Sequence, residues 1–221
     1  QEILQNPQGV QDHLNRCLLC GSCDADLPRA KRDLCPRCAL ESPAGAVCGR
    51  CLAHPPHYDA TVAALAYRFP ADVLVQALKF RGQLALAPFL GDLLSKCISS
   101  NDVDYVVPVP LSPERLRSRG YNQALEIARH VAHPAGGRLA PELCERTRDT
   151  PAQTELPLAE RAKNVRGAFH CPRLLAGARV AVLDDVMTTA ATLDEMAVTL
   201  KRAGAAHVVN WVVARTFPTH V

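Results

Sequence analysis

The stretch "VAVLDDVMTTAATL", residues 180–193, carries the clearest structural pattern in the chain. It places a short apolar run before two adjacent aspartates, Asp184 and Asp185, and follows them with three threonines. The apolar run predicts a buried strand over 179–184, and the spacing of the later apolar residues predicts a helix over 190–203. Strand, turn and helix in this order form the repeating unit of a mostly parallel sheet.

The chain on either side of this stretch continues the same alternation. Apolar runs predict further strands over 60–69, 104–110, 142–146 and 207–214, and helical spacing predicts helices over 71–80, 84–98 and 122–132. The predicted fold class is therefore α/β, a mostly parallel sheet flanked by helices.

The two aspartates mark a candidate binding site. In an open parallel sheet, ligands bind beyond the carboxyl ends of the strands, where Asp184 and Asp185 are expected to lie and to repel each other in the empty site. The turn "MTTAAT" (187–192) runs into a helix N-terminus, whose free N–H groups attract phosphate. Carboxylates accept hydrogen bonds from sugar hydroxyls. A ribose 5-phosphate has both groups.

Two other interpretations fit parts of this stretch. An apolar strand ending in two aspartates also occurs in nucleotide-binding proteins, but their partner motif G-x-x-x-x-G-K-[ST] is absent from this chain. Alternatively, the aspartates are merely solvated at a strand end and a threonine caps the helix. That interpretation explains each residue singly and the combination less well.

The cysteines divide the chain into two modules. Seven of the ten crowd into residues 17–51, so we predict a tail over 1–16, a zinc-ribbon module over 17–57 and the α/β domain over 58–221. Two C-x-x-C pairs in succession are typical of tetrahedral zinc, with disulfides or free thiols as the alternatives. The predicted zinc ligands are Cys35, Cys38, Cys48 and Cys51.

A second metal site in this module is less complete. Cys17, Cys20 and Cys23 supply three thiols, and His54 or His57 is the candidate fourth ligand. The module contains few apolar residues and many turn formers, so bound metal is expected to supply much of its folding energy. The predicted role of zinc is structural.

Composition excludes several classes of protein. The apolar share of 48% and the net charge of +3 are ordinary for a globular chain. No stretch approaches the ~20 apolar residues of a membrane helix, and the first residues lack the pattern of a signal peptide. A cytoplasmic location is expected.

Three stretches carry a family resemblance. "VAVLDDVMTTAAT" resembles the phosphoribosyl pyrophosphate (PRPP) motif of type I phosphoribosyltransferases. "PVPLSPERLRSRGYNQA" (108–124) and "TPAQTELPLAERAKNVRGAF" (150–169) resemble the ComF/GntX family, which is linked to competence and DNA uptake. The cysteine-rich segment followed by "LKFRG" (78–82) is also similar to that family.

The resemblance implies a type I phosphoribosyltransferase fold and a set of site residues. Asp184 and Asp185 would bind the ribose hydroxyls, and the 188–192 turn the 5-phosphate, while "VPVP" (107–110) would flank the pyrophosphate and 150–169 would form a mobile cover. The implied PRPP-binding residues are Asp184, Asp185, Val186, Met187, Thr188, Thr189, Ala190, Ala191 and Thr192. The family usually has glycine at the position of Ala190. Alanine is costly there if φ is positive.

The implied reaction displaces pyrophosphate at the anomeric carbon with Mg²⁺ bound to PRPP, which requires positioning and charge stabilisation more than a protein nucleophile. The loop between the strand over 104–110 and the next helix holds Arg115, Arg117 and Arg119, which are suited to pyrophosphate oxygens, as is Arg161 in the cover. The acceptor of the ribose is not identified by the sequence.

Three functional classes follow. The first is a phosphoribosyltransferase and the second a PRPP-binding regulator without turnover. The third is a DNA-uptake accessory protein, acting with competence or DNA-uptake proteins. Direct nucleic-acid binding has little support, because the cysteine-rich module mixes basic with acidic residues and residues 17–57 contain no aromatic side chain.

Overall fold

A parallel sheet forms the centre of the computed structural model, which describes residues 18–30, 33–99, 102–133, 135–148 and 164–217. The sheet has five strands in the order β1-β7-β6-β2-β3, and all four neighbouring pairs are parallel. Its strands are β1 (Ala60–Ala66), β2 (Tyr105–Pro108), β3 (Arg138–Leu139), β6 (Arg179–Met187) and β7 (His207–Arg215). A separate antiparallel pair joins β4 (Glu145–Arg146) to β5 (Phe169–His170).

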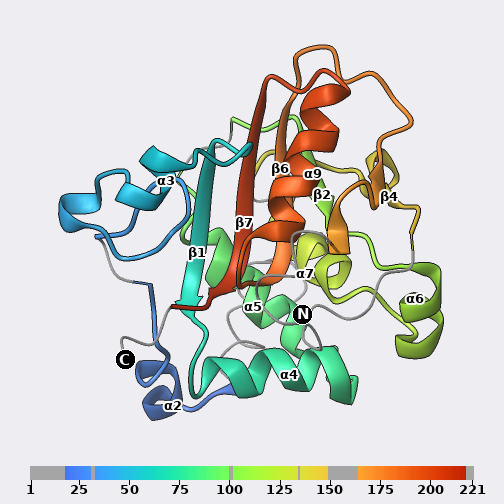
Figure 1. Ribbon diagram of the computed structural model, residues 1–221. Coiled ribbons are helices and arrows are strands. Elements are labelled where there is room, and N and C mark those ends of the chain that lie inside the picture. The colour runs from blue at the N-terminus through green and yellow to red at the C-terminus, as the bar shows by residue number, and fades with distance from the viewer. Residues whose placement is uncertain (1–17, 31–32, 100–101, 134, 149–163, 218–221) are drawn as a thin grey trace.

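Helices cover both faces of this sheet (Figure 1). The described α-helices are α2 (Gly21–Ala25), α3 (Gly49–Ala53), α4 (Ala71–Arg81), α5 (Leu86–Ser95), α6 (Pro113–Arg119), α7 (Gln123–Val131) and α9 (Ala191–Arg202). Two short 3₁₀ turns are η2 (Pro43–Gly45) and η3 (Pro141–Leu143). The predicted fold class, a mostly parallel sheet flanked by helices and preceded by a small cysteine-rich module, is confirmed.

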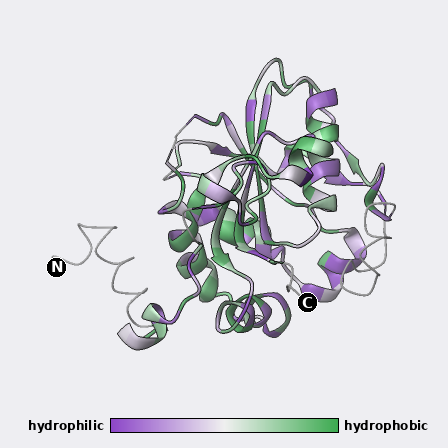
Figure 2. Ribbon diagram, turned by 60° about the vertical axis from the view of Figure 1, so that its left-hand side comes forward, coloured by the Kyte–Doolittle hydropathy of each residue, from purple (hydrophilic) through white to green (hydrophobic). Residues whose placement is uncertain are grey.

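The alternation of side chains along each strand divides the core into two layers. Ala181 and Leu183 of β6 face the layer formed with α4, α5 and α7, whereas Val180 and Val182 face the layer formed with α9. Figure 2 shows the strands and the helix faces against them as mostly apolar. Burial on both faces explains why the strands read as continuous apolar runs.

The structure corrects three of the predicted elements. Strand β6 continues beyond residue 184 to Met187, because its pairing with β7 continues to Met187 and Arg215. The predicted strand over 142–146 is a 3₁₀ turn followed by the two-residue strand β4. The predicted loop that carries three arginines is largely the helix α6.

The cysteine-rich segment packs on the sheet. The Thr61 N–H donates to the Pro36 carbonyl at 2.9 Å, and Ala39 and Tyr58 are buried in the same layer as α9. Helix α4 lies across the end of the sheet at which β1 has its arrowhead, whereas α3 lies toward the opposite end (Figure 1). The carboxyl ends of the strands are thus close to α4.

Candidate functional site

The paired aspartates lie in the last part of β6. Asp184 pairs in register with Val212 of β7, and Val186 with Ala214. Asp185 is buried, with 2% of its surface exposed, whereas Asp184 is half-buried. Both carboxyl groups are therefore held by a continuous strand at the carboxyl end of the sheet, where open parallel sheets bind ligands.

A lysine from α4 reaches this pair. Lys79 Nζ lies 3.0 Å from Oδ2 of Asp185 and 3.4 Å from its Oδ1. The sequence marks the "LKFRG" segment (78–82) only by its similarity to the ComF/GntX family, and Lys79 is not among the predicted site residues. No local spacing connects residue 79 with residue 185, so the contact follows only from the fold.

The two carboxyl groups differ in their electrostatics. Burial raises the pKa of Asp184 well above its usual range, and the neighbouring Asp185 charge raises it further. Burial alone would also raise the pKa of Asp185, but the Lys79 charge and hydrogen bonds from Asp184, Lys79 and the Val186 N–H lower it overall. For Lys79, the two carboxylates outweigh burial and raise its pKa. The site therefore holds one ion pair and one carboxyl group that resists ionisation.

Aromatic and basic groups surround Lys79. Lys79 Nζ lies 5.9 Å from the centre of the exposed Phe80 ring, and the Arg119 guanidinium lies 5.5 Å from it. Tyr121 donates through its hydroxyl to the Leu78 carbonyl. The Asn122 amide donates to the Val109 carbonyl at 3.0 Å, which ties the start of α7 to the end of β2. The segment "RGYNQ" (119–123) thus fixes α4 and β2 around the carboxylates.

The turn after β6 has an unusual backbone at its last residue. Ala190, the N-cap of α9, has φ 71° and ψ 2°, in the left-handed region. Alanine is disfavoured there because its Cβ crowds the backbone, and glycine is not. The Thr189 hydroxyl accepts from the Ala191 N–H at 3.4 Å. The turn therefore leads into the N-terminus of α9 through a conformation suited to glycine.

The three predicted pyrophosphate arginines all lie in α6, but on different faces of the helix. Arg115 and Arg119 are four residues apart and share one helix face, whereas Arg117 projects from the other. Arg119 is also bonded to Gln123 Oε1 and lies over the Phe80 ring. The helix signals were present: Ser112 caps its N-terminus, Pro113 takes the first position and Gly120 follows its end. Arg161 lies outside the described residues.

The described part of the predicted cover begins at residue 164 and meets α9. The Gly167 N–H donates to Glu195 Oε1 at 2.7 Å. On the other side, His57 Nδ1 lies 2.9 Å from Asp194 Oδ2. These contacts border a surface pocket lined by His57, Arg166, Gly167, Ala191, Asp194, Glu195, Val198 and Arg202. The pocket opens next to the turn, and residues 150–163 of the cover are outside the described part of the chain.

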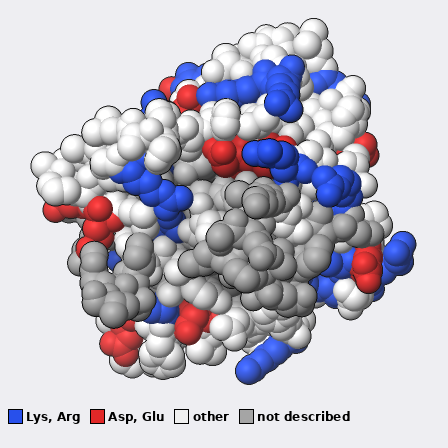
Figure 3. All heavy atoms as spheres, in the orientation of Figure 1, with Lys and Arg blue, Asp and Glu red and all other residues white. Residues whose placement is uncertain are grey.

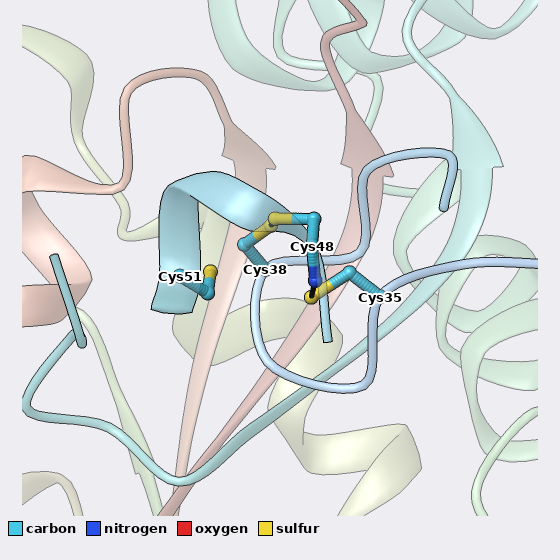
Figure 4. A group of neighbouring side chains, drawn as sticks. All are labelled: Cys35, Cys38, Cys48 and Cys51. Carbon is cyan, nitrogen blue, oxygen red and sulfur yellow. Dashed lines mark hydrogen bonds between the residues drawn. The ribbon is translucent and has the colours of Figure 1, made fainter. Parts of the chain in front are cut away.

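Four cysteines form a compact cluster. The sulfur atoms of Cys35, Cys38, Cys48 and Cys51 all lie within 4.8 Å of one another. Figure 4 shows how the loop with Cys35 and Cys38 meets helix α3, which Cys48 caps and which contains Cys51, with the Cys48 N–H donating to Cys35 Sγ at 3.3 Å. Cys38 Sγ lies 3.7 Å from Cys48 Sγ. Tetrahedral zinc with Zn–S bonds of about 2.3 Å places its sulfurs about 3.8 Å apart.

The electrostatics of the cluster also fit a cation. Burial raises the pKa of Cys38 and of Cys51, and the neighbouring thiols contribute. Burial would raise that of Cys35 as well, but backbone N–H groups of Cys48, Cys38 and Arg37 lower its pKa to about 7. Four thiolates this close together, three of them buried, repel one another without a cation. The geometry and donor set fit a metal such as zinc.

The first cysteine cluster is not assembled in the same way. Cys17 is outside the described residues, and Cys20 and Cys23 are exposed at the start of α2. Among the described side chains, neither His54 nor His57 joins them in a ligand group, and His57 instead contacts Asp194. A second metal site stays a prediction.

The face of the molecule in Figure 3 carries several groups of basic side chains, with acidic side chains between some of them. None of the described helices combines the length and apolar content that crossing a membrane requires.

Fold and site together define an α/β protein with a candidate phosphate turn on a parallel sheet and a four-cysteine cluster beside it. The chain is 35% identical over 208 residues to DNA utilization protein YhgH of Salmonella typhi, covering 90% of each chain. It is 31% identical over 212 residues to YhgH of Escherichia coli K12, covering 92% of each. Competence protein F of Haemophilus influenzae is 28% identical over 217 residues, covering 94% of this chain and 89% of that relative. The chain belongs to the ComF family of competence and DNA utilization proteins, as its motifs predict.

Two other comparisons complete the picture. No family model matches the chain. A solved purine phosphoribosyltransferase from Pyrococcus horikoshii superposes with a TM-score of 0.31 at 13% identity, covering 73% of this chain and 94% of that structure.

Proposed function

We propose that the chain binds PRPP at the junction of β6 and α9 and transfers its phosphoribosyl group to an acceptor, with release of pyrophosphate. The observation that carries this proposal is the sequence of groups along one connection. Asp184 and Asp185 lie near the end of β6, Ala190 takes a left-handed backbone after the strand, and the N-terminus of α9 follows at once. Along the chain, carboxylates that can accept from ribose hydroxyls are therefore followed by N–H groups that can donate to a 5-phosphate.

Each part of the ligand has a candidate partner. The carboxylates of Asp184 and Asp185 would accept hydrogen bonds from the ribose hydroxyls, and the N–H groups of residues 188–192 would donate to the 5-phosphate. Lys79 beside the carboxylates, and Arg119 over the neighbouring Phe80 ring, are the candidate partners of the pyrophosphate oxygens. A ligand with hydroxyls and a pyrophosphate would thus contact both the acidic and the basic side chains of the site.

The chemistry needs no protein nucleophile. The bond between the anomeric carbon and the pyrophosphate oxygen breaks, its electron pair leaves with pyrophosphate, and the acceptor forms the new bond at that carbon. Bound Mg²⁺, for which the oxygens of Asp184 and Asp185 are the candidate protein ligands, would offset charge on the pyrophosphate. Lys79 and Arg119 would stabilise the same charge.

A second function remains for the same site. The relatives are named for DNA utilization and for competence, which supports a role in the use or uptake of DNA, in the cytoplasm and together with competence proteins. A regulator that binds PRPP without turnover would use the same residues. The small net charge of +3 favours a protein or nucleotide partner over direct contact with a DNA backbone.

Calorimetry with PRPP and Mg²⁺ tests the binding step. The double variant Asp184→Asn with Asp185→Asn is expected to lose binding, because both acceptors of the ribose hydroxyls are removed. Asp102→Asn is the matched control, since Asp102 is exposed just before β2, whose start pairs with the start of β6, away from the carboxylates. Equal PRPP binding by the parent and the double variant would refute the assignment.

A further inference from the structure

Arg215, the last residue of β7, joins two parts of the molecule that lie far apart in the sequence, the cysteine cluster and the turn after β6. Its side chain is buried, with 2% of the residue exposed. Nε donates to the Cys38 carbonyl at 2.9 Å. Nη1 donates to the Met187 carbonyl at 2.8 Å and also to the Thr188 carbonyl. One guanidinium thus contacts both the four-cysteine cluster and the candidate phosphate turn.

These contacts fix the backbone at two functionally relevant places. Cys38 supplies a thiol to the cluster, and its carbonyl is held by the same guanidinium that holds residues 187 and 188. Those two residues begin the turn that ends at the left-handed Ala190. A fourth contact, at 2.9 Å, joins Nη1 to the Thr216 carbonyl. The guanidinium is planar and rigid. A shift of one of the carbonyls bonded to it therefore displaces the guanidinium and changes its hydrogen bonds to the other carbonyls.

Arg215 is also placed to balance the charge of an occupied cluster. Four thiolates around one Zn²⁺ carry two net negative charges, and the buried guanidinium that donates to the Cys38 carbonyl is a nearby counter-charge.

We propose that Arg215 is a positioning residue that couples metal occupancy of the four-cysteine cluster to the ligand affinity of the turn at residues 187–190. With metal bound, the Cys38 loop and the guanidinium are fixed, and the turn is held in the conformation that receives phosphate. Metal loss loosens one anchor and raises the cost of ordering the turn on binding. The ligand part of this proposal rests on the proposed PRPP function.

The experiment measures this coupling in the full chain. PRPP affinity, with Mg²⁺ supplied after removal of the chelator, is determined for zinc-loaded and zinc-depleted protein, both shown to be folded by circular dichroism. In the parent, zinc depletion is expected to weaken PRPP binding about fivefold or more, a typical size for coupling between sites. In Arg215→Lys, which keeps the charge and loses the fork of donors, zinc-loaded protein should bind weakly and depletion should change little.

Arg179→Lys is the matched control, because Arg179 begins β6 at the opposite end of the strand and is partly exposed. It should keep the zinc dependence of the parent. A purely structural role for Arg215 would lower the melting temperature of Arg215→Lys and leave the fold-change on zinc depletion intact. That result would overturn the proposal.

Amide hydrogen exchange supplies a measurement that needs neither PRPP nor a folded variant. In the parent, zinc depletion should speed exchange at residues 187–191 while leaving α5 and α7 protected. Unchanged exchange in the turn would refute the coupling. If the turn responds to zinc but PRPP does not bind, the proposed function fails and the coupling stands.

Discussion

Lys79 Nζ and Asp185 Oδ2 lie 3.0 Å apart, although 106 positions separate the two residues in the sequence. The contact brings α4 over the end of β6 and compensates one of two adjacent carboxylates. Asp184, beside it, has no comparable compensation, and its pKa is raised by burial and by the Asp185 charge. The ligand-free site therefore stores electrostatic strain that a ligand with hydroxyls or a bound cation would relieve.

Asp184→Asn is expected to stabilise the ligand-free protein at neutral pH. A raised pKa in the folded state means that the folded chain binds more protons than the unfolded chain above about pH 4, so stability falls as pH rises through that range. Asparagine removes this loss. The melting temperature of the variant should exceed that of the parent at pH 7, and the difference should shrink toward pH 4. A lower melting temperature at pH 7 would contradict this.

Asp185→Asn is expected to act in the opposite direction. The pKa of Asp185 is lowered in the folded state, so its contribution to stability is present above about pH 4 and is lost as pH falls. Removing it leaves Lys79 without its partner and should cost about 1–3 kcal/mol at pH 7. Thermal melts at pH 7 that rank both asparagine variants alike would show that the two carboxyl groups do not differ as described.

Ala190→Gly is expected to stabilise the protein and to tighten PRPP binding. At φ 71°, alanine costs about 1 kcal/mol relative to glycine, which is partly offset by the greater freedom of glycine in the unfolded chain. The melting temperature should rise by up to about 3 °C, and PRPP affinity should rise several-fold because the turn becomes easier to order around phosphate.

Ala176→Gly is the control for this substitution. Ala176 also has a positive φ, 44°, but it precedes β6 at the end away from the turn. It should raise thermal stability without changing PRPP affinity. If both variants changed affinity equally, the effect at Ala190 would be one of general stability.

The three arginines of α6 are expected to contribute unequally. Arg119 lies over the Phe80 ring beside Lys79, whereas Arg117 is exposed on the other helix face. Arg119→Gln should weaken pyrophosphate and PRPP binding about tenfold, the effect of losing a charge-assisted hydrogen bond of about 1.4 kcal/mol. Arg117→Gln should leave both affinities within about twofold. Calorimetry with pyrophosphate that gives the reverse order would place the pyrophosphate elsewhere.

Purified, reduced protein is expected to contain at least one zinc ion per chain. Cys51→Ser should lose this zinc and melt at a lower temperature, because the loop that packs on Thr61 and Arg215 loses its metal anchor. Cys97→Ser is the control, since Cys97 is exposed beyond α5 and is not among the four clustered cysteines. Elemental analysis that finds no zinc in the parent would exclude the metal site.

The sequence predicted those features that depend on local pattern. The strands predicted over 60–69 and 179–184 correspond to β1 and β6, whose apolar residues carry a clear signal because these strands are covered on both faces. The C-x-x-C spacing of Cys35, Cys38, Cys48 and Cys51 predicted the cluster that the structure shows. Helix α6 was missed although Ser112 and Gly120 mark its ends, since arginine-rich segments without an apolar stripe resemble loops.

The features that were missed depend on long-range contacts. Nothing near Lys79 in the sequence indicates a partner at Asp185, and nothing near Arg215 indicates contacts with both Cys38 and Met187. The sequence likewise did not predict the sign of φ at Ala190, because alanine is found with negative and with positive φ. It is decided by the pairing of β6 with β7 and by the start of α9.

The most direct test of the account is pyrophosphate release from PRPP and Mg²⁺, measured for the parent and for Asp184→Asn with Asp185→Asn across nucleobases, aromatic amines, ammonia and water. The account predicts steady release by the parent with one acceptor, and loss of that release in the double variant. Measurable PRPP binding without release from any acceptor would contradict a transferase and leave a PRPP-binding regulator. Release that survives in the double variant would contradict the site itself.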